Sequence, residues 1–391
     1  MLKGLKYRIS PTNSQKELIT KHIGSSRFVY NLALETKNSA YLGSKHNFSP
    51  FDLIKQLPEL KKECEWLKEV NSQSLQQSIQ NMDIAFKKFF KGAGFPRFKS
   101  KHKGRQSFSV PQNVIVEKGL LVIPKFKEGI DIILHRPIKG TIKSATISVT
   151  PTGKYFASIL VDTDEIAPIK APIKEETTVG VDLGIKTFLV TSNGLEIDNP
   201  KHLCKAQSKL KYVQRKYSKN KGKRTKKRLA LLHEKVVNKR KDFLHKTSSN
   251  LINDSQIDTI ALEDLNVAGM VKNHNLAQAI NDVSWSAFVT MLEYKAEWYG
   301  KNILRIGRFA PSSKTCSCGV INKDLKLSDR TWTCKSCGVT HDRDILAANN
   351  IKFFALKNNL SGTDRKNHGE LPTLVGVLTL EAHPIASGVG G

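Results

Sequence analysis

Three acidic side chains lie where regular segments of the sequence begin or end. Asp182 lies inside an apolar, β-branched run at residues 179–191. Glu263 ends a second apolar run, and Asp344 begins an Ala-rich helical segment. A carboxylate on a buried strand is costly unless a positive charge neutralises it, and a metal ion is the natural candidate. Taken alone, Asp182 could equally sit at an exposed strand end, and Asp344 is better explained as an ordinary helix N-cap; the three acids together favour a metal site.

Three such carboxylates can hold two Mg²⁺ or Mn²⁺ ions. One ion then activates a water molecule, and the other stabilises the leaving oxygen of a phosphodiester. Asp342 is a rival for the third ligand, because it lies two residues before Asp344. Helical geometry turns the two side chains about 200° apart, so only one can face the ions. Asp344 is favoured because it leads directly into the Ala-rich turn, and the pattern predicts a metal-dependent nuclease.

Four of the six cysteines form two pairs, each followed by a glycine. The pairs are Cys316-x-Cys318 and Cys334-x-x-Cys337, with fifteen residues between them. Soft thiolate ligands in this layout are typical of a zinc ribbon, and free cysteines in a core are the alternative. The first pair is one residue shorter than the usual Cys-x-x-Cys, which makes that turn tighter. We predict a Zn²⁺ ion bound by the four thiolates.

The elements that must position the three acids follow the order β-β-β-α-β-α-β. The expected strands are residues 179–183, 187–191, 195–197, 259–263 and 303–306, with a helix at about residues 284–299. Acids on the first and fourth strands, with a third acid on a closing helix, are the RNase H-like arrangement. The sequence therefore predicts an RNase H-like nuclease fold.

Composition indicates a nucleic-acid partner. The 391 residues include 63 Lys and Arg against 35 Asp and Glu, a net charge of +28. An excess this large is expected of a nucleic-acid binder, with a merely solvated basic surface as the alternative.

No apolar run reaches the 18–20 residues of a membrane span and no secretory segment is present, so we expect a cytoplasmic protein with no membrane partner. Cys64 and Cys204 are expected to be reduced core residues.

The charge excess is greatest at residues 209–246. A run of like charge can be disordered, but Leu229, Leu232 and Val236 supply apolar anchors. A long helix or a helical pair with a cationic face is therefore predicted, and such a face binds a phosphate backbone without reading sequence. The candidate contacts are Arg215, Arg224, Lys226, Lys227 and Arg228.

Helices dominate the N-terminal part after a predicted strand at residues 5–9. Separate helices are expected at residues 15–23, from about residue 25 and from about residue 50. The clearest helix, residues 72–90, has a core-facing apolar stripe. Its other face carries amides, which can pair with adenine in a major groove, although a plain solvated face is the commoner explanation. These amides are Gln73, Gln76, Gln77 and Gln80.

A Gly/Pro loop at residues 92–105 interleaves Phe95 and Phe98 with basic residues. The rings can stack on bases while the cations hold phosphates, and two rings that anchor the loop to its own domain explain the pattern equally well. The cations are Arg97, Lys99, Lys101 and Arg105. A period of two from residue 107 to residue 164 then predicts a small antiparallel barrel or sandwich.

In this order, the motifs resemble those of the TnpB family, RNA-guided nucleases of small bacterial insertion sequences related to type V CRISPR effectors. The resemblance covers residues 1–357 and depends on Gly-Phe-Pro-Arg-Phe-Lys, Val-Gly-Val-Asp-Leu-Gly-Ile-Lys, Leu-Glu-Asp-Leu-Asn, Ser-Ser-Lys-Thr-Cys and Asp-Arg-Asp. It implies that Asp182, Glu263 and Asp344 are a RuvC-type triad. Leu346 departs from the family, which usually has Asn there, and we expect this to lower activity.

The resemblance implies an α+β multidomain chain. Its expected parts are a β-barrel wedge domain at 1–10 and 92–165, an inserted helical recognition lobe at 11–91, a linker at 166–176, a RuvC-like nuclease domain at 177–310 and 340–357, a zinc ribbon at 311–339 and a flexible tail at 358–391.

The family also implies the partners: a guide RNA, with one protein chain for each RNA, and double-stranded target DNA cut next to a short transposon-adjacent motif. Because recognition helices and wedge read that motif in the family, the amides of residues 73–80 become better candidates. A nuclease-inactive RNA-guided DNA-binding repressor and a transposase acting directly on DNA ends stay open as alternatives. The presence of all three acids favours the endonuclease.

Overall fold

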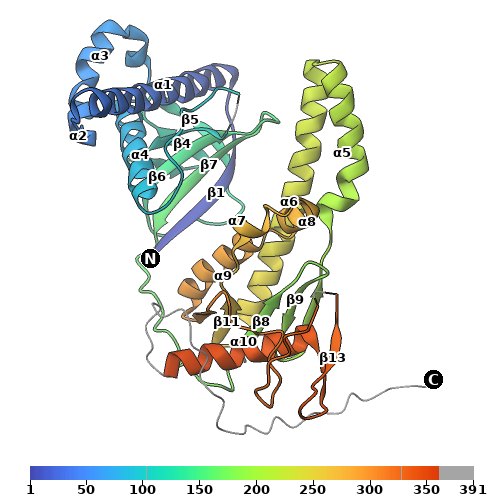
Figure 1. Cartoon of the computed structure of the whole chain (residues 1–391). Helices are drawn as coiled ribbons and strands as arrows, with labels where there is room; N and C mark the ends of the chain where they lie inside the picture. The colour runs from blue at the N-terminus through green and yellow to red at the C-terminus, as the bar shows by residue number, and fades with distance from the viewer. Residues whose placement is uncertain (103, 327, 361–391) are drawn as a thin grey trace. The chain divides into compact units, whose positions relative to one another are not determined.

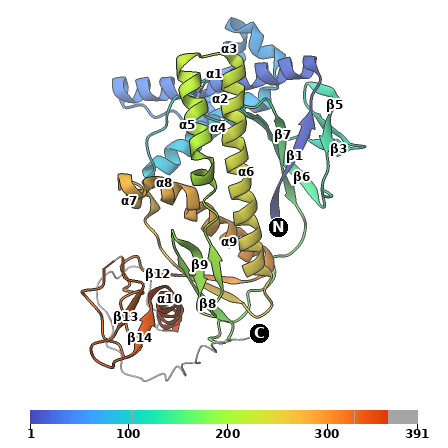
Figure 2. The same ribbon diagram turned by 90° about the vertical axis from the view of Figure 1, so that its right-hand side faces the viewer.

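The computed structural model describes residues 1–102, 104–326 and 328–360. These residues form two compact units that divide between Ile166 and Ala167 (Figures 1 and 2). The division falls at the start of the predicted linker, and residues 166–176 form neither helix nor strand. The predicted tail lies outside the described residues except for residues 358–360, which belong to the last helix.

The first unit contains a seven-stranded antiparallel sheet with the order β2-β6-β7-β1-β5-β4-β3. Its strands are β1 (Leu2–Ser10), β2 (Gln106–Val110), β3 (Ile115–Glu117), β4 (Leu120–Ile123), β5 (Phe126–Ile133), β6 (Thr141–Val149) and β7 (Tyr155–Asp162). Their alternating apolar residues form one core. In the described part of the chain no ladder joins β2 to β3, so a closed barrel stays a prediction.

The helices of the first unit are α1 (Asn13–Ser44), α2 (Pro50–Lys55), α3 (Leu57–Glu63), a short 3₁₀ helix (Glu65–Glu69) and α4 (Ser72–Phe90). The bounds of α4 are those predicted. The expectation of two helices within residues 13–44 was wrong, because an internal Gly24 costs a helix only about 1 kcal/mol. Ile19 of α1 packs in the sheet core, while Val29 and Leu34 pack in a second core with α4, so both halves of α1 are held.

The second unit is built on a five-stranded sheet with the order β10-β9-β8-β11-β12 (Figure 1). Its strands are β8 (Thr178–Leu183), β9 (Thr187–Thr191), β10 (Glu196–Asp198), β11 (Thr259–Glu263) and β12 (Asn302–Ile306). β11 runs parallel to β8 and pairs Leu262 with Val181. Parallel strands end at the same edge of a sheet. Asp182 and Glu263, the next residues of the two strands, are therefore neighbours at that edge.

The helices of the second unit are α5 (His202–Lys219), α6 (Lys223–Asn253), α7 (Val267–Met270), α8 (His274–Val283), α9 (Trp285–Tyr299) and α10 (Arg343–Leu360). α5 and α6 form the predicted helical pair, a hairpin that projects from the sheet in both views (Figures 1 and 2). The base of α6 and α9 cover one sheet face, where Leu244 and Phe288 pack on Val181. α10 covers the other face, where Ile351 packs on Ala261. α7 and α8 were not predicted.

Gly180 allows α10 to approach the backbone of β8. A methyl group on Gly180 would lie 1.9 Å from the carbonyl oxygen of Ala348 and 2.7 Å from the backbone nitrogen of Lys352. Backbone atoms cannot rotate out of the way as a flexible side chain can. This contact therefore fixes the position of α10, and with it the position of Asp344 in the first turn of that helix.

We expect Gly180→Ala to lower the free energy of unfolding by about 3 kcal/mol, the upper part of the range for overpacked cores. Gly24→Ala is the matched control, because its methyl group meets nothing within 4 Å. Replacing a glycine inside a helix stabilises by roughly 0.5–1 kcal/mol. Denaturant unfolding of both variants measures the two effects, and equal stability of the two would contradict the close approach of α10 to β8.

Among the residues of the described ranges, no helix is both long enough and apolar enough to cross a membrane.

Candidate functional site

The three predicted acids influence one another at the edge of the second sheet. Burial raises the pKa of Asp182, and the negative charges of Glu263 and Asp344 add to the increase, while Arg343 opposes it; the net pKa is about 7. Within the described residues, the three carboxylates are not among the side chains grouped closely enough to hold one metal ion, which are the four paired cysteines. The three carboxylates form a concentration of negative charge that suits divalent cations.

Glu263 is held by a serine that the sequence analysis did not single out. The hydroxyl of Ser312 donates a hydrogen bond to Oε1 of Glu263. Burial raises the pKa of Glu263, and this hydrogen bond partly opposes the increase. Asn350 of α10 in turn donates from Nδ2 to the carbonyl oxygen of Ser312 at 2.6 Å. The only sequence signal for this role was the Ser-Ser-Lys-Thr run that leads into the first cysteine pair.

Asp344 pairs with an arginine from the loop between the two cysteine pairs. Nη1 of Arg330 donates to both carboxylate oxygens of Asp344 at 3.1 Å. Asp342, the rival candidate, caps α10: its Oδ1 accepts hydrogen bonds from the N–H groups of Asp344 and Ile345 at 2.9 and 3.0 Å. The alternative explanation of Asp344 as the N-cap was therefore wrong, because Asp342 already satisfies the exposed N–H groups at the start of the helix.

The half-buried carboxyl of Asp182 predicts how stability depends on pH in protein that contains zinc but no Mg²⁺ or Mn²⁺. The pKa of Asp182 rises from 3.8 to about 7 in the fold. The folded state therefore holds this proton more tightly than the unfolded state does. The stabilisation is complete below about pH 4 and is lost as pH rises through about 7, a change of up to about 4 kcal/mol.

We expect Asp182→Asn to remove most of this pH dependence, because the amide does not titrate. Glu263 shifts in the same direction and should leave a smaller slope. Denaturant unfolding of parent and variant between about pH 4 and pH 8 measures the difference. Identical slopes for the two proteins would contradict the burial of a titrating Asp182 carboxyl.

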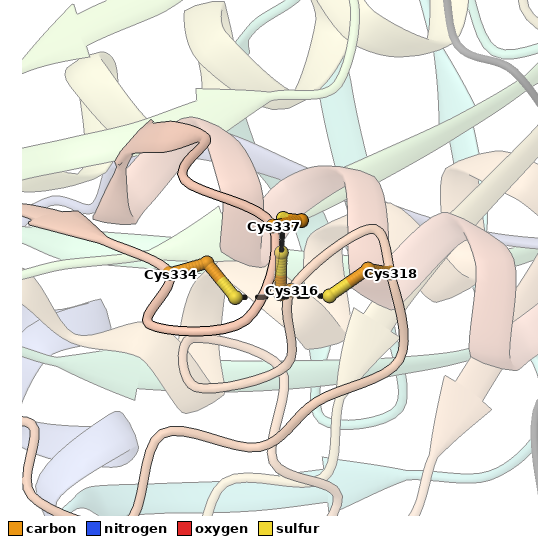
Figure 3. Close-up of side chains that lie close together, drawn as sticks. All are labelled: Cys316, Cys318, Cys334 and Cys337. Carbon is orange, nitrogen blue, oxygen red and sulfur yellow. Dashed lines mark hydrogen bonds between the residues drawn. The ribbon is translucent and has the colours of Figure 1, made fainter.

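The four paired cysteines converge on one point (Figure 3). Their sulfur atoms all lie within 4.8 Å of one another. The distance is 3.5 Å between Sγ of Cys316 and Cys337, and 3.7 Å between Sγ of Cys318 and Cys334. Four thiolates about 2.3 Å from a tetrahedral zinc ion lie about 3.8 Å apart. The cluster therefore has the dimensions of a zinc site even with the shortened first pair.

Two short strands, β13 (Thr331–Thr333) and β14 (Thr340–Asp342), join the cysteine cluster to α10. Leu346 of α10 is buried against Cys316, Cys334 and Trp332. The residue that departs from the family pattern thus packs the ribbon against the helix that carries Asp344. The other two cysteines are free: Cys64 is half-buried, but Cys204 is exposed, so its expected place in a core was wrong.

The amides predicted on α4 are partly engaged within the first unit. Nε2 of Gln73 donates to Gln112 at 3.0 Å, and Nε2 of Gln77 donates to Asn81 at 3.3 Å. Gln76 is half-buried and Gln80 is exposed. Gln80 is therefore the amide that α4 presents most openly to a partner.

The loop at residues 92–105 is anchored at one of its two rings. Phe95 packs against Phe86 and Phe89, with ring centroids 5.6 and 5.3 Å apart. The ammonium of Lys99 lies 3.8 Å from the ring centroid of Tyr30, and burial lowers its pKa. Phe98 stays 55% exposed. Phe95 is therefore held by ring contacts although it is itself 50% exposed. The other predicted residues of the loop are exposed as well: Phe98, Arg97, Lys99, Lys101 and Arg105.

The five predicted cations of the α5–α6 hairpin are all exposed: Arg215, Arg224, Lys226, Lys227 and Arg228. The base of the hairpin is fixed by Asp282, a buried carboxylate in the last turn of α8. It accepts hydrogen bonds from the N–H group of Leu203 at 3.0 Å and from Arg240 of α6 at 3.2 Å. A cationic arm with a fixed base can hold a phosphate backbone over its length.

Family models match most of the chain. Residues 158–274 match one described as "Probable transposase", residues 285–351 match "Cas12f1-like, TNB domain", and residues 1–45 match "Helix-turn-helix domain". The second match contains the cysteine cluster and the start of α10.

Relatives and a solved structure agree with these matches. A protein of Streptomyces pristinaespiralis named "Putative RNA-guided DNA endonuclease" is 38% identical over 372 residues, which cover 92% of this chain and 91% of that one. "Putative RNA-guided DNA endonuclease InsQ" of Escherichia coli K12 is 28% identical, with 90% and 91% covered. The protein in the cryo-EM structure of the Cas12f1-sgRNA-target DNA complex has the same fold, with a TM-score of 0.55 at 13% identity over 90% of this chain and 98% of that chain. The Streptomyces protein is 38% identical over more than nine tenths of both chains, which shows that this chain belongs to the TnpB family.

Proposed function

We propose that this protein is an RNA-guided DNA endonuclease of a bacterial insertion sequence, acting in the cytoplasm. It cuts double-stranded DNA paired to a guide RNA, next to a short transposon-adjacent motif, by metal-dependent phosphodiester hydrolysis. The observation that carries the proposal is the cluster made by Asp182 and Glu263 at one sheet edge with Asp344 at the start of α10, where burial and repulsion from the other two carboxylates raise the pKa of Asp182. The names of the two relatives support the guided reaction.

The carboxylates of Asp182, Glu263 and Asp344 are the proposed ligands of Mg²⁺ or Mn²⁺. Divalent ions bound there supply an activated water and stabilise the leaving oxygen of the phosphodiester. The strand order, with acids on β8 and β11 and a third acid on α10, supports a RuvC-like, RNase H-like domain at residues 177–310 and 340–357. Asp182 is half-buried, and its carboxylate interacts electrostatically with those of Glu263 and Asp344.

The four cysteines are the proposed ligands of a structural zinc ion. With zinc bound, the ribbon at residues 311–339 holds Ser312 and Arg330 against Glu263 and Asp344. The ribbon thereby orients two of the three acids.

The first unit is proposed to contain the recognition lobe and the wedge domain that read the DNA motif, through Gln80 and the loop at residues 92–105. The α5–α6 hairpin is proposed to hold nucleic-acid backbone, with one protein chain for each guide RNA. The exposure of the five candidate cations supports this role; the ion pairs described for α6 involve Arg240 and Lys246 instead, which pair with Asp282 and Asp242.

Replacing Arg224, Lys226, Lys227 and Arg228 with Ala should weaken binding to every RNA and DNA sequence. Each cation that contacts a phosphate releases a counterion, so the slope of log affinity against log salt should flatten by up to about four units. Fluorescence anisotropy of the purified protein with labelled RNA at several salt concentrations measures the slope.

The matched control exchanges each of the four cations for the other type, arginine for lysine and lysine for arginine. Charge is preserved, so the slope should stay at the parent value. A slope that the four alanines leave unchanged would show that the hairpin does not contact backbone phosphates.

A further inference from the structure

We propose that Ser312 is a positioning residue for Glu263. The Ser312 hydroxyl fixes one carboxylate oxygen of Glu263 and leaves the other oxygen for a divalent cation. The inference rests on the proposed function, because it assumes that Glu263 is a metal ligand. Oε1 of Glu263 accepts the hydrogen bond from the Ser312 hydroxyl. Oε2 accepts none from the side chains and backbone that the structure describes. One carboxylate oxygen of Glu263 is thus oriented by Ser312, and the other is available to bind a cation.

Ser312 can hold Glu263 in place because its own backbone is fixed. It is only 6% exposed. Its N–H group donates to the carbonyl oxygen of Ala310 at 2.8 Å. Its carbonyl oxygen accepts from Nδ2 of Asn350, which is itself buried. A hydroxyl on so constrained a backbone has few alternative positions, so the hydrogen bond restricts the rotamer of Glu263.

The same contacts connect Glu263 to the rest of the site. Nδ2 of Asn350 also donates to the carbonyl oxygen of Thr315 at 2.7 Å, directly before Cys316. Asn350 lies on α10, the helix that begins beside Asp344. One side chain therefore fixes both ends of residues 312–315, the segment between the carboxylate cluster and the cysteine cluster. Partners that orient a metal ligand typically change metal affinity or activity about 10–100-fold.

Mn²⁺ binding tests the inference without cleavage. Binding of Mn²⁺ alone to the full chain is measured by titration calorimetry or electron paramagnetic resonance. We expect Ser312→Ala to weaken Mn²⁺ binding at the carboxylates by about 10–100-fold. Ser312→Thr, which keeps the hydroxyl, should restore affinity. Ser313→Ala is the matched control, because the half-buried hydroxyl of Ser313 makes no hydrogen bond in the described part of the chain.

Zinc content and thermal unfolding without Mn²⁺ check that each variant is folded. If folded Ser312→Ala binds Mn²⁺ within about twofold of the parent, far below the expected change, the inference is wrong. If Ser312→Ala does not fold, Ser312→Thr decides: parental affinity supports the hydroxyl, and a folded Thr variant with weakened binding contradicts it. A failure of the proposed function gives a different result: the parent would bind Mn²⁺ no more tightly than Asp182→Ala does. In that case the inference about Ser312 would be wrong as well.

Discussion

Asp182→Ala should abolish cutting of guided DNA while leaving RNA binding and guided DNA binding unchanged. Asp182 lies near the end of β8 within the carboxylate cluster, whereas the candidate nucleic-acid cations lie on α5 and α6. Removing a metal ligand should lower the cutting rate more than removing a residue that only orients a ligand. We therefore expect the cutting rate to fall by more than about 100-fold. Cleavage assays with purified RNA–protein complex measure the rate, and gel shift with the same DNA measures binding.

Asp342→Ala is the matched control for this prediction. Asp342 caps α10 and belongs to the same acidic segment as Asp344. Removing an N-cap costs about 1 kcal/mol of stability, so most of the cutting should remain. Parental cutting by Asp182→Ala, or a loss of RNA binding in step with cutting, would contradict the assignment of Asp182 to the metal site.

The double variant Cys334→Ser/Cys337→Ser should lose its zinc and unfold the ribbon. We expect about one zinc ion for each chain of the parent and none for the variant. The effect should be large, because zinc binding supplies roughly 10–16 kcal/mol of the folding free energy of small zinc domains. Arg330 and Ser312 contact Asp344 and Glu263 from this region, so Mn²⁺ binding and cutting should decline as well.

Elemental analysis measures the zinc, and limited proteolysis between Cys316 and Cys337 reports whether the ribbon is folded. Cys204→Ser is the control, because Cys204 is exposed and lies outside the cysteine cluster. Its zinc content and its protease resistance should equal those of the parent. A zinc-free parent with a protease-resistant ribbon would show that the shortened Cys316-x-Cys318 pair has lost its metal.

Local sequence patterns were sufficient to predict the elements that carry the acids. Apolar runs that contain an acid or end in one identify β8 and β11, and an apolar stripe of helical period identifies α4. The parallel pairing of β8 with β11 then brings Asp182 and Glu263 to one edge. The strands and the helix depend on residues close together in the chain, so the sequence alone reveals them. The pairing of β8 with β11 joins residues 81 positions apart, such as Thr178 and Thr259, and was expected from the RNase H-like order of the elements.

Contacts between distant residues could not be predicted in this way. Ser312 reaches Glu263 across 49 residues, and Arg330 reaches Asp344 across 14. Neither has a composition or a spacing that indicates its partner. The continuity of α1 through Gly24 was missed for a related reason, since it depends on packing against two separate cores.

The most direct test begins with the protein purified from its host and the RNA that accompanies it. That RNA is sequenced, and the complex is mixed with DNA that carries a matching target and flanking sequence libraries, with and without Mg²⁺. We expect one dominant RNA and cuts in matched DNA next to a short motif, dependent on both RNA and Mg²⁺. Guided binding without cutting in Mg²⁺ or Mn²⁺ would instead identify a nuclease-inactive repressor, and cutting or joining of DNA ends without RNA would identify a transposase.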